Sequence, residues 1–64
     1  MFIKTENGNL INTRFIYEII VSEQFSDGTY GVIAGVQMSG TRILSRHNTK
    51  EEAEKERDKY FQMN

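Results

Sequence analysis

The sequence contains no cysteine, so no disulfide can add stability to the fold. It has a single histidine, and one histidine without cysteines falls far short of the ligand set of a structural zinc ion. A domain of 64 residues has a small core, and small domains commonly add stability with disulfides, metals or a second subunit. We therefore expect a second copy of the chain, or another protein, to supply additional buried surface.

Proline is absent too, and no Ser/Gly-rich run or internal repeat divides the chain, so we expect one domain over residues 1–64. Even the longest apolar runs, such as residues 19–21, are far shorter than the roughly 20 residues that a membrane span needs. The start of the sequence shows no basic segment followed by a long apolar stretch, as a signal peptide would. The expected setting is cytoplasmic, without membrane contact, and the lack of cysteine fits a reducing compartment.

A helix is predicted near the C-terminus, where Thr49 has the properties of an N-cap. Its side-chain oxygen can accept the free backbone N–H of Glu52, and the Glu52 side chain can reach back to the N–H of the cap. The residues before this capping box show only strand and turn signals. We therefore divide the domain into a β-meander over residues 1–48 and a C-terminal helix over residues 49–63.

Short turn signals separate the expected strands. Asn7-Gly8 is the strongest, because both residues accept the positive φ that a type I′ hairpin turn requires. Further turns are expected at residues 26–28 and 39–40, and strands at residues 2–5, 10–12, 15–24, 29–38 and 41–47. Since consecutive strands pair antiparallel by default, the sequence predicts an α+β fold. It is an antiparallel β-meander sheet of three to five strands with one C-terminal helix packed on one face.

Period-2 alternation divides the two long strands into a core face and an open face. The predicted core face carries Phe15, Tyr17, Ile19, Val21, Tyr30, Val32, Ala34, Val36 and Met38. From the helix, we expect Ala53, Tyr60 and Phe61 to dock on these residues. In the last strand Ile43 and Leu44 are adjacent, so one of them points to each face, and the sequence leaves open which one is in the core.

The opposite face carries apolar residues that a single helix cannot cover. Ile16, Ile20 and Ile33 would form a modest apolar patch there, and such a patch often marks an interface, although scattered exposed apolar residues are also normal. Gly31 and Gly35 fall on the same side, where they let the strand bend or let a partner's backbone come close. A free sheet edge, which can accept a strand from a partner, is the second predicted contact surface.

A small basic patch suggests nucleic-acid binding as the alternative. Arg42 and Arg46 share one side of the last strand by alternation, and His47 adjoins them. Arg14 is expected to join this patch, and tyrosines of the sheet could stack on a base. The formal net charge of −1 lacks the basic surplus of a typical nucleic-acid binder, so nucleic acid is the less favoured partner.

No constellation of residues indicates catalysis. His47 is the only side chain with an unperturbed pKa near neutrality, and Ser45 lies on the same strand face, but no third group accompanies them. The carboxylates concentrate at residues 51–58, on a helix whose solvated face explains them without a catalytic or cation site. We predict that the chain is not an enzyme and needs no cofactor, metal or small-molecule substrate.

Four segments together resemble small uncharacterised proteins of phages and Gram-positive bacteria: Phe2-Ile3-Lys4-Thr5, Gly8-Asn9-Leu10-Ile11-Asn12, Ile16-x-x-Ile19 and Asn48-Thr49-Lys50-Glu51-Glu52-Ala53-Glu54. The resemblance implies a compact β-meander-plus-helix domain that is phage-encoded, and small phage proteins often bind a host protein. It carries over no functional residues. The resulting prediction is a small non-catalytic protein-interaction module, acting on a host protein or as a homodimer.

Overall fold

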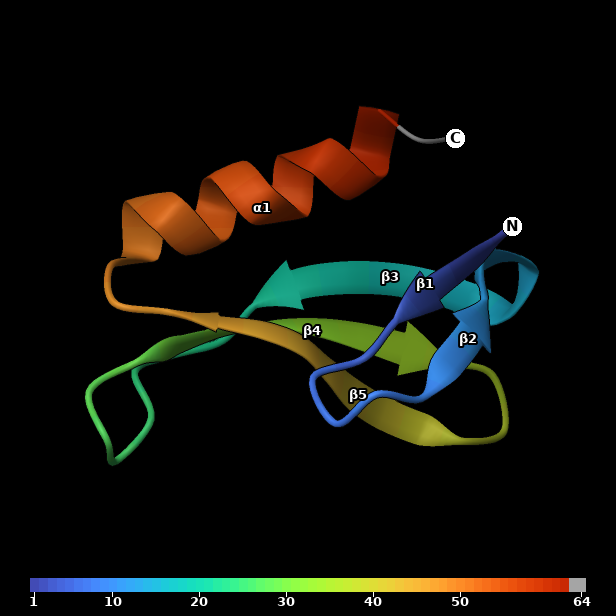
Figure 1. The fold of residues 1–64 in the computed structure, drawn as a ribbon, viewed down its shortest axis with the longest axis horizontal. Helices are drawn as coiled ribbons and strands as arrows, with labels where there is room; N and C mark the ends of the chain where they lie inside the picture. The colour runs from blue at the N-terminus through green and yellow to red at the C-terminus, as the bar shows by residue number, and fades with distance from the viewer. Residues whose placement is uncertain (63–64) are drawn as a thin grey trace.

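The computed structural model describes the backbone of residues 1–62 and the side chains of residues 1–60. The elements are β1 (Phe2–Lys4), β2 (Leu10–Asn12), a short 3₁₀ helix (Thr13–Phe15), β3 (Ile16–Val21), β4 (Tyr30–Val36), β5 (Gly40–His47) and α1 (Lys50–Gln62) (Figure 1). This order confirms the predicted α+β fold. The predicted end of the helix at Met63 and the docking of the Phe61 side chain lie outside the described residues.

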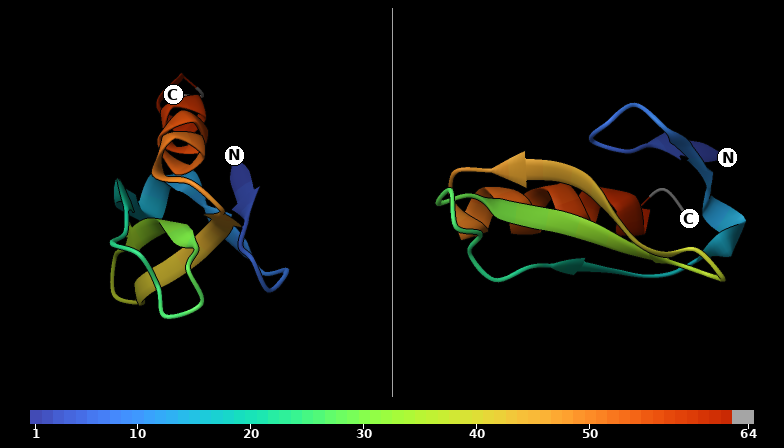
Figure 2. Two further views of the ribbon diagram at one scale, coloured as in Figure 1. Left: turned by 90° about the vertical axis from the view of Figure 1, so that its left-hand side faces the viewer. Right: turned by 90° about the horizontal axis from the view of Figure 1, so that it is seen from below.

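The strands form two antiparallel units. β3, β4 and β5 make a three-stranded sheet in that order, and β1 pairs with β2 in a separate hairpin. Helix α1 lies across one face of the three-stranded sheet, and the hairpin lies beside β5, away from β3 (Figure 2). One backbone bond joins the two units, from the Glu6 N–H to the Ile43 carbonyl at 2.9 Å. The predicted meander is therefore split after its first two strands.

The hairpin loops at Asn7-Gly8 and Asp27-Gly28 confirm two predicted turns, but the type I′ geometry predicted for Asn7-Gly8 is wrong. The Gly8 N–H bonds to the Thr5 carbonyl at 3.1 Å, and φ is 91° at Gly8 and 87° at Gly28. A type I′ turn would also need a positive φ at Asn7, which is not among the residues with one. Both loops instead close with one left-handed glycine, a conformation that glycine adopts without steric cost.

The core lies between α1 and one face of the sheet. Its buried members are Ile3, Val32, Ala34, Val36, Leu44 and Ala53. Val32 has no exposed surface, and burial of such a side chain contributes about 1.5–3 kcal/mol relative to its exposed state. Ala53 is also fully buried, so the helix touches the sheet through its smallest apolar side chain, and half-buried Tyr60 extends the contact.

The N-terminus of α1 confirms the predicted N-cap. The Thr49 side-chain oxygen accepts the Glu52 N–H at 3.2 Å, and the Thr49 carbonyl accepts the Ala53 N–H at 3.2 Å. The second half of the capping box differs, because the Glu52 carboxylate accepts the Thr49 hydroxyl proton, also at 3.2 Å, rather than a backbone N–H. The start of the helix could thus be predicted from two side chains.

A bulge in β3 corrects the predicted alternation. The pairing shifts between Ile16 and Glu18, so that Tyr17 has no partner on β4. Strict alternation placed Ile16 on the open face and Tyr17 in the core, and both predictions are wrong. Ile16 packs against the core, whereas the Tyr17 side chain is 61% exposed. An extra residue in one strand reverses the facing of every residue on one side of it.

The ends of the long strands account for two more errors in the predicted core. Phe15 belongs to the 3₁₀ helix before β3 and is exposed, and Met38 belongs to the turn after β4, where it is fully exposed. A second bulge, in β5, settles the choice between Ile43 and Leu44. Val32 pairs with Ser45 and the next residue of β4 pairs with Ile43, so Leu44 is the extra residue, and it is buried in the core.

Candidate functional site

Three isoleucines form a row across the face of the sheet that α1 does not cover. Ile20 on β3 is opposite Ile33 on β4, and Ile33 is opposite Ile43 on β5. Directly opposed residues in antiparallel strands point to the same face. We call this surface the open face. Ile20 is 44% exposed, and the other two are half-buried, so the row remains in contact with solvent. The structure thus brings Ile20 and Ile33 together, as predicted, and adds Ile43 in place of Ile16.

Two aromatic rings cover the glycines of the open face. A methyl group at Gly31 would lie 2.7 Å from the Cε2 and Cζ atoms of Phe25, and one at Gly35 would lie 2.7 Å from Cζ of Tyr17. The rings therefore occupy the space that side chains at these positions would take. The glycines accommodate aromatic side chains of this chain itself, which is a more specific role than the predicted bend or partner contact. Both glycines are buried as a result.

Arg46 adds a charged group beside the Phe25 ring. Its guanidinium carbon lies 4.8 Å from the ring centre, a cation–π distance. The same guanidinium forms an ion pair with Glu6, from the loop of the β1–β2 hairpin, and lies 3.6 Å from Asp27, from the loop between β3 and β4. Arg46 therefore ties two loops to one end of the open face.

The carboxylate of Asp27 is held mainly by its neighbour Thr29. The Thr29 hydroxyl and backbone N–H donate to the carboxylate at 2.6 and 3.0 Å. These bonds, with a further contribution from Arg46, lower the pKa of Asp27 below its usual value of 3.8. The lowered pKa keeps Asp27 ionised to lower pH than an ordinary aspartate, and so available to Arg46.

The predicted basic patch is not assembled. Arg42 pairs with Ala34 of the core face, whereas Arg46 pairs with Gly31 of the open face, so the bulge at Leu44 places the two arginines on opposite sides. The prediction that they share one side is wrong. The Arg42 guanidinium donates to the carbonyls of Ser39 and Thr41 at 2.6 and 2.9 Å, beside its own turn.

The other two members of the predicted patch lie on further elements. Arg14 is exposed on the 3₁₀ helix before β3. His47 pairs with Tyr30, on the face opposite Arg46. The four predicted cationic side chains therefore do not form one continuous patch.

Ser45 and His47 contact each other without forming a recognisable catalytic site. The Ser45 hydroxyl and His47 Nε2 are 2.8 Å apart, as their shared strand face predicts. Neither residue lines the cavity between α1 and β3. Among residues 1–60, no group of three or more His, Cys, Asp or Glu side chains is placed to hold a metal ion.

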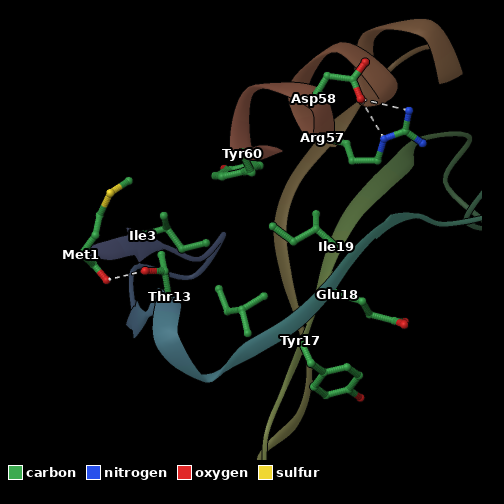
Figure 3. Close-up of a pocket in the computed structure, with 10 residues that line it drawn as sticks. Met1, Ile3, Thr13, Tyr17, Glu18, Ile19, Arg57, Asp58 and Tyr60 are labelled. Atoms are coloured by element: carbon green, nitrogen blue, oxygen red, sulfur yellow. Dashed lines mark hydrogen bonds and ion pairs between the residues drawn. The ribbon is translucent and has the colours of Figure 1, made fainter. Parts of the chain in front are cut away.

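A cavity of about 360 Å³ opens between α1, β3 and the start of the chain (Figure 3). Its lining residues are Met1, Ile3, Thr13, Ile16, Tyr17, Glu18, Ile19, Arg57, Asp58 and Tyr60. Arg57 and Asp58 pair with each other at 3.1 Å, and burial, with Glu56 nearby, raises the pKa of Tyr60. Figure 3 shows the Tyr17 ring pointing away from Ile3 and Ile19, which line this cavity. The polar groups at the rim do not converge on a point, as a specific ligand site would require.

The outer edge of β3 is the second contact surface predicted from the sequence. Among the backbone groups of residues 1–62 and the side chains of residues 1–60, no hydrogen bond involves that edge of β3 between Ile19 and Val21. The outer edge of β5 differs, because its Ile43 carbonyl accepts the Glu6 N–H. One edge of the sheet is therefore free and the other is partly occupied.

Comparison with protein-family models, with curated proteins and with solved structures finds no match to this chain. No helix among the described residues combines the length and apolar character needed to cross a membrane. The case for a function therefore rests on the open face and the free edge of β3.

Sequence reasoning missed three residues of the open face: Tyr17, Phe25 and Ile43. Ile43 was left undecided because the bulge in β5 has no clear signal in the sequence. A usable signal existed for the two aromatics. Two glycines on one face of a central strand leave gaps, and large side chains from a neighbouring strand or loop commonly fill such gaps.

Proposed function

We propose that this chain is a small, non-catalytic protein-interaction module that binds a protein partner through the open face of its sheet. The observation that carries the proposal is the solvent-accessible row of Ile20, Ile33 and Ile43 on the face that α1 leaves uncovered. An apolar row on a small domain is stabilised when another protein surface removes it from water, at about 25 cal/mol per Å² of apolar area.

The surroundings of the row support a protein rather than a small ligand as the partner. Tyr17 and Phe25 fill the two gaps left by the glycines, so the face is broad and has no hollow at Gly31 or Gly35. Aromatic residues at the border of an apolar patch are typical of protein interfaces. The Arg46 side chain at one end is neutralised by Glu6 and Asp27, which favours a partner surface of low net charge.

The proposed partner is a protein of another kind, or a second copy of the chain. The resemblance to small phage proteins supports a host protein as the first of these. A cytoplasmic setting belongs to the same proposal, because a chain without cysteine suits a reducing compartment.

The test is capture of partners from a host lysate by the tagged protein and by two open-face variants, Ile20→Asp and Ile43→Asp. Leu10→Asp is the matched control, because Leu10 is 66% exposed on the separate hairpin. We expect a stoichiometric protein to bind the parent chain and Leu10→Asp, and to be lost in both open-face variants. Binding that persists in Ile20→Asp and Ile43→Asp would contradict the proposal.

Nuclease treatment of the lysate separates the nucleic-acid alternative. A protein partner that binds the open face is retained after nuclease. Recovery that collapses with nuclease, and that weakens in Arg42→Ala and Arg46→Ala, would replace the proposal with nucleic-acid binding by Arg14, Arg42, Arg46 and His47.

A further inference from the structure

The free edge of β3 has a backbone pattern that can be assigned residue by residue. The Ser22 N–H bonds to the Gly31 carbonyl on β4 at 2.8 Å. Backbone groups of successive residues in a strand turn to opposite sides, so Ile20 also faces β4, whereas Ile19 and Val21 face away from it. The N–H and C=O groups of Ile19 and Val21 therefore point outward from the sheet.

This edge lacks the usual protection of a sheet edge in a monomer. Natural edge strands carry lysine, proline, bulges or inward-pointing charges that prevent pairing with another chain. β3 has a bulge at its start, but residues 19–21 are Ile-Ile-Val, with regular pairing to β4 and no charge. Glu18 is the only charged residue of β3. In Figure 2 β3 forms the margin of the sheet on the side away from the β1–β2 hairpin.

We propose that two copies of this chain pair antiparallel through β3, with a two-fold axis at Ile20, and form one continuous six-stranded sheet. In this register Ile19 lies opposite Val21 of the second copy, and Val21 lies opposite its Ile19. Each of these pairs exchanges two N–H···O bonds, which satisfies all the outward backbone groups of residues 19 and 21. Main-chain pairing of this kind gives affinity, and the side chains give register.

The side chains of β3 favour this register over those centred on Glu18 or Ile19. Centring the axis on Glu18 would oppose two carboxylates, and like charges directly across a pair of strands are destabilising. Centring it on Ile19 would put Glu18 against Ile20 of the second copy and leave both without a suitable neighbour. With the axis at Ile20, Glu18 lies opposite Ser22 and the two Ile20 side chains meet on the open face.

The pairing also continues the apolar row of the open face. Ile43, Ile33 and Ile20 of one copy would be followed across the axis by the same three residues in reverse order. On the other face, Ile19 and Val21 extend the cores, because both already pack against the core beneath α1. The inference goes beyond the proposed function, because it concerns a different surface and remains testable if no other protein binds the open face.

A charge-swap experiment tests the register. Ile20→Lys and Ile20→Glu are tolerated by the fold because the side chain is 44% exposed, and circular dichroism checks this. By sedimentation velocity we expect the parent chain at twice the monomer mass of 7.5 kDa. Each variant alone is expected to be a monomer, and an equimolar mixture is expected to recover the dimer. A parent chain that is monomeric at all concentrations overturns the inference.

A second variant tests the backbone pairing. Val21→Pro removes an N–H that faces away from β4, so no hydrogen bond of the sheet is lost, and edge strands tolerate such a proline. We expect this variant to be a folded monomer. Ile43→Asp, which alters the open face on β5 and leaves the β3 edge unchanged, is the control and is expected to remain a dimer. A dimer that survives Val21→Pro overturns edge pairing, and loss of that dimer in Ile43→Asp would identify the open faces as the interface.

Amide hydrogen exchange gives a direct readout that is independent of mutation. The amides of Ile19 and Val21 are expected to exchange slowly at high protein concentration and rapidly on dilution, while the inward Ile20 amide stays protected throughout. Equal, rapid exchange at Ile19 and Val21 at all concentrations would overturn the pairing. Ile43→Asp separates the two proposals, because partner binding that persists in this variant would contradict the proposed function and leave these dimer results unchanged.

Discussion

Phe25 occupies the space that a side chain at Gly31 would need, and the guanidinium of Arg46 lies against the same ring. The three residues belong to the loop before β4, to β4 and to β5, so one contact links three parts of the sheet. Glycine at residue 31 is therefore a condition for the Phe25 position, and the Phe25 position is a condition for the Arg46 contact.

This dependence predicts a sign change in a double-mutant cycle. Gly31→Ala should lower the free energy of unfolding by about 1–3 kcal/mol, because the methyl group displaces the Phe25 ring. In a Phe25→Ala background the same substitution should raise it by about 0.5–1 kcal/mol, because glycine is unfavourable in a strand interior and the remaining close atom, Ser22 Oγ at 3.3 Å from the methyl group, needs only a small shift. Urea unfolding of the four proteins measures both values. An equal cost of Gly31→Ala in the two backgrounds would count against the contact.

Met38 is expected to be a site where stability can be gained. Its φ is 64°, a left-handed conformation that costs a non-glycine residue about 1 kcal/mol, and its side chain is fully exposed. Met38→Asn should recover most of this, because asparagine tolerates positive φ, and should raise the melting temperature by about 4–8 °C. Gln37→Asn, at the neighbouring position of the same turn, is the control and should bring no gain. Calorimetry decides between these outcomes.

The N-cap of α1 should contribute measurably to folding. Thr49→Ala removes the acceptor for the Glu52 N–H and is expected to cost about 1 kcal/mol in urea unfolding. Thr49→Asp keeps an acceptor at the same place and should lose little. If both variants lost the same amount, the side-chain oxygen would not be the group that stabilises the helix start.

Thr29→Val should change the acid stability of the protein through Asp27. The lowered pKa means that the folded state binds this proton less tightly than the unfolded chain does. The stabilisation is therefore present above the usual value of 3.8 and is lost as the pH falls through the folded-state pKa. Removing the Thr29 hydroxyl should raise the pKa of Asp27 toward 3.8, as an NMR titration of the carboxyl carbon can measure. Thr41→Val, which alters an exposed threonine on β5, should leave that pKa unchanged.

Much of the fold could be predicted because its signals are local. Thr49 and Glu52 mark the helix start within one turn of chain, and Gly8 and Gly28 mark two hairpin loops. The predicted antiparallel sheet with one covering helix followed from these signals and from alternation, and the structure confirms it. Alternation also identified Ile19, Val32 and other core residues correctly.

The errors come from two bulges, which are tertiary features. An extra residue at Tyr17 exchanged Tyr17 with Ile16, and an extra residue at Leu44 separated Arg42 from Arg46. Neither bulge contains a glycine, which is the residue that would have predicted a bulge from the sequence. The open face could therefore be predicted in outline, through Ile20 and Ile33. Its third isoleucine could not be predicted, and the gaps at Gly31 and Gly35 were the only signal for its aromatic border.

The two margins of the sheet are unequal, and this limits what can be built from it. The Glu6 N–H occupies the Ile43 carbonyl on the outer side of β5, and the bulge at Leu44 spoils regular pairing there. Copies joined through β3 would present only β5 margins to the outside. Assembly would stop at two copies. The β-prone segment of residues 15–21 would then not polymerise into fibres, as a sheet with two unprotected edges can.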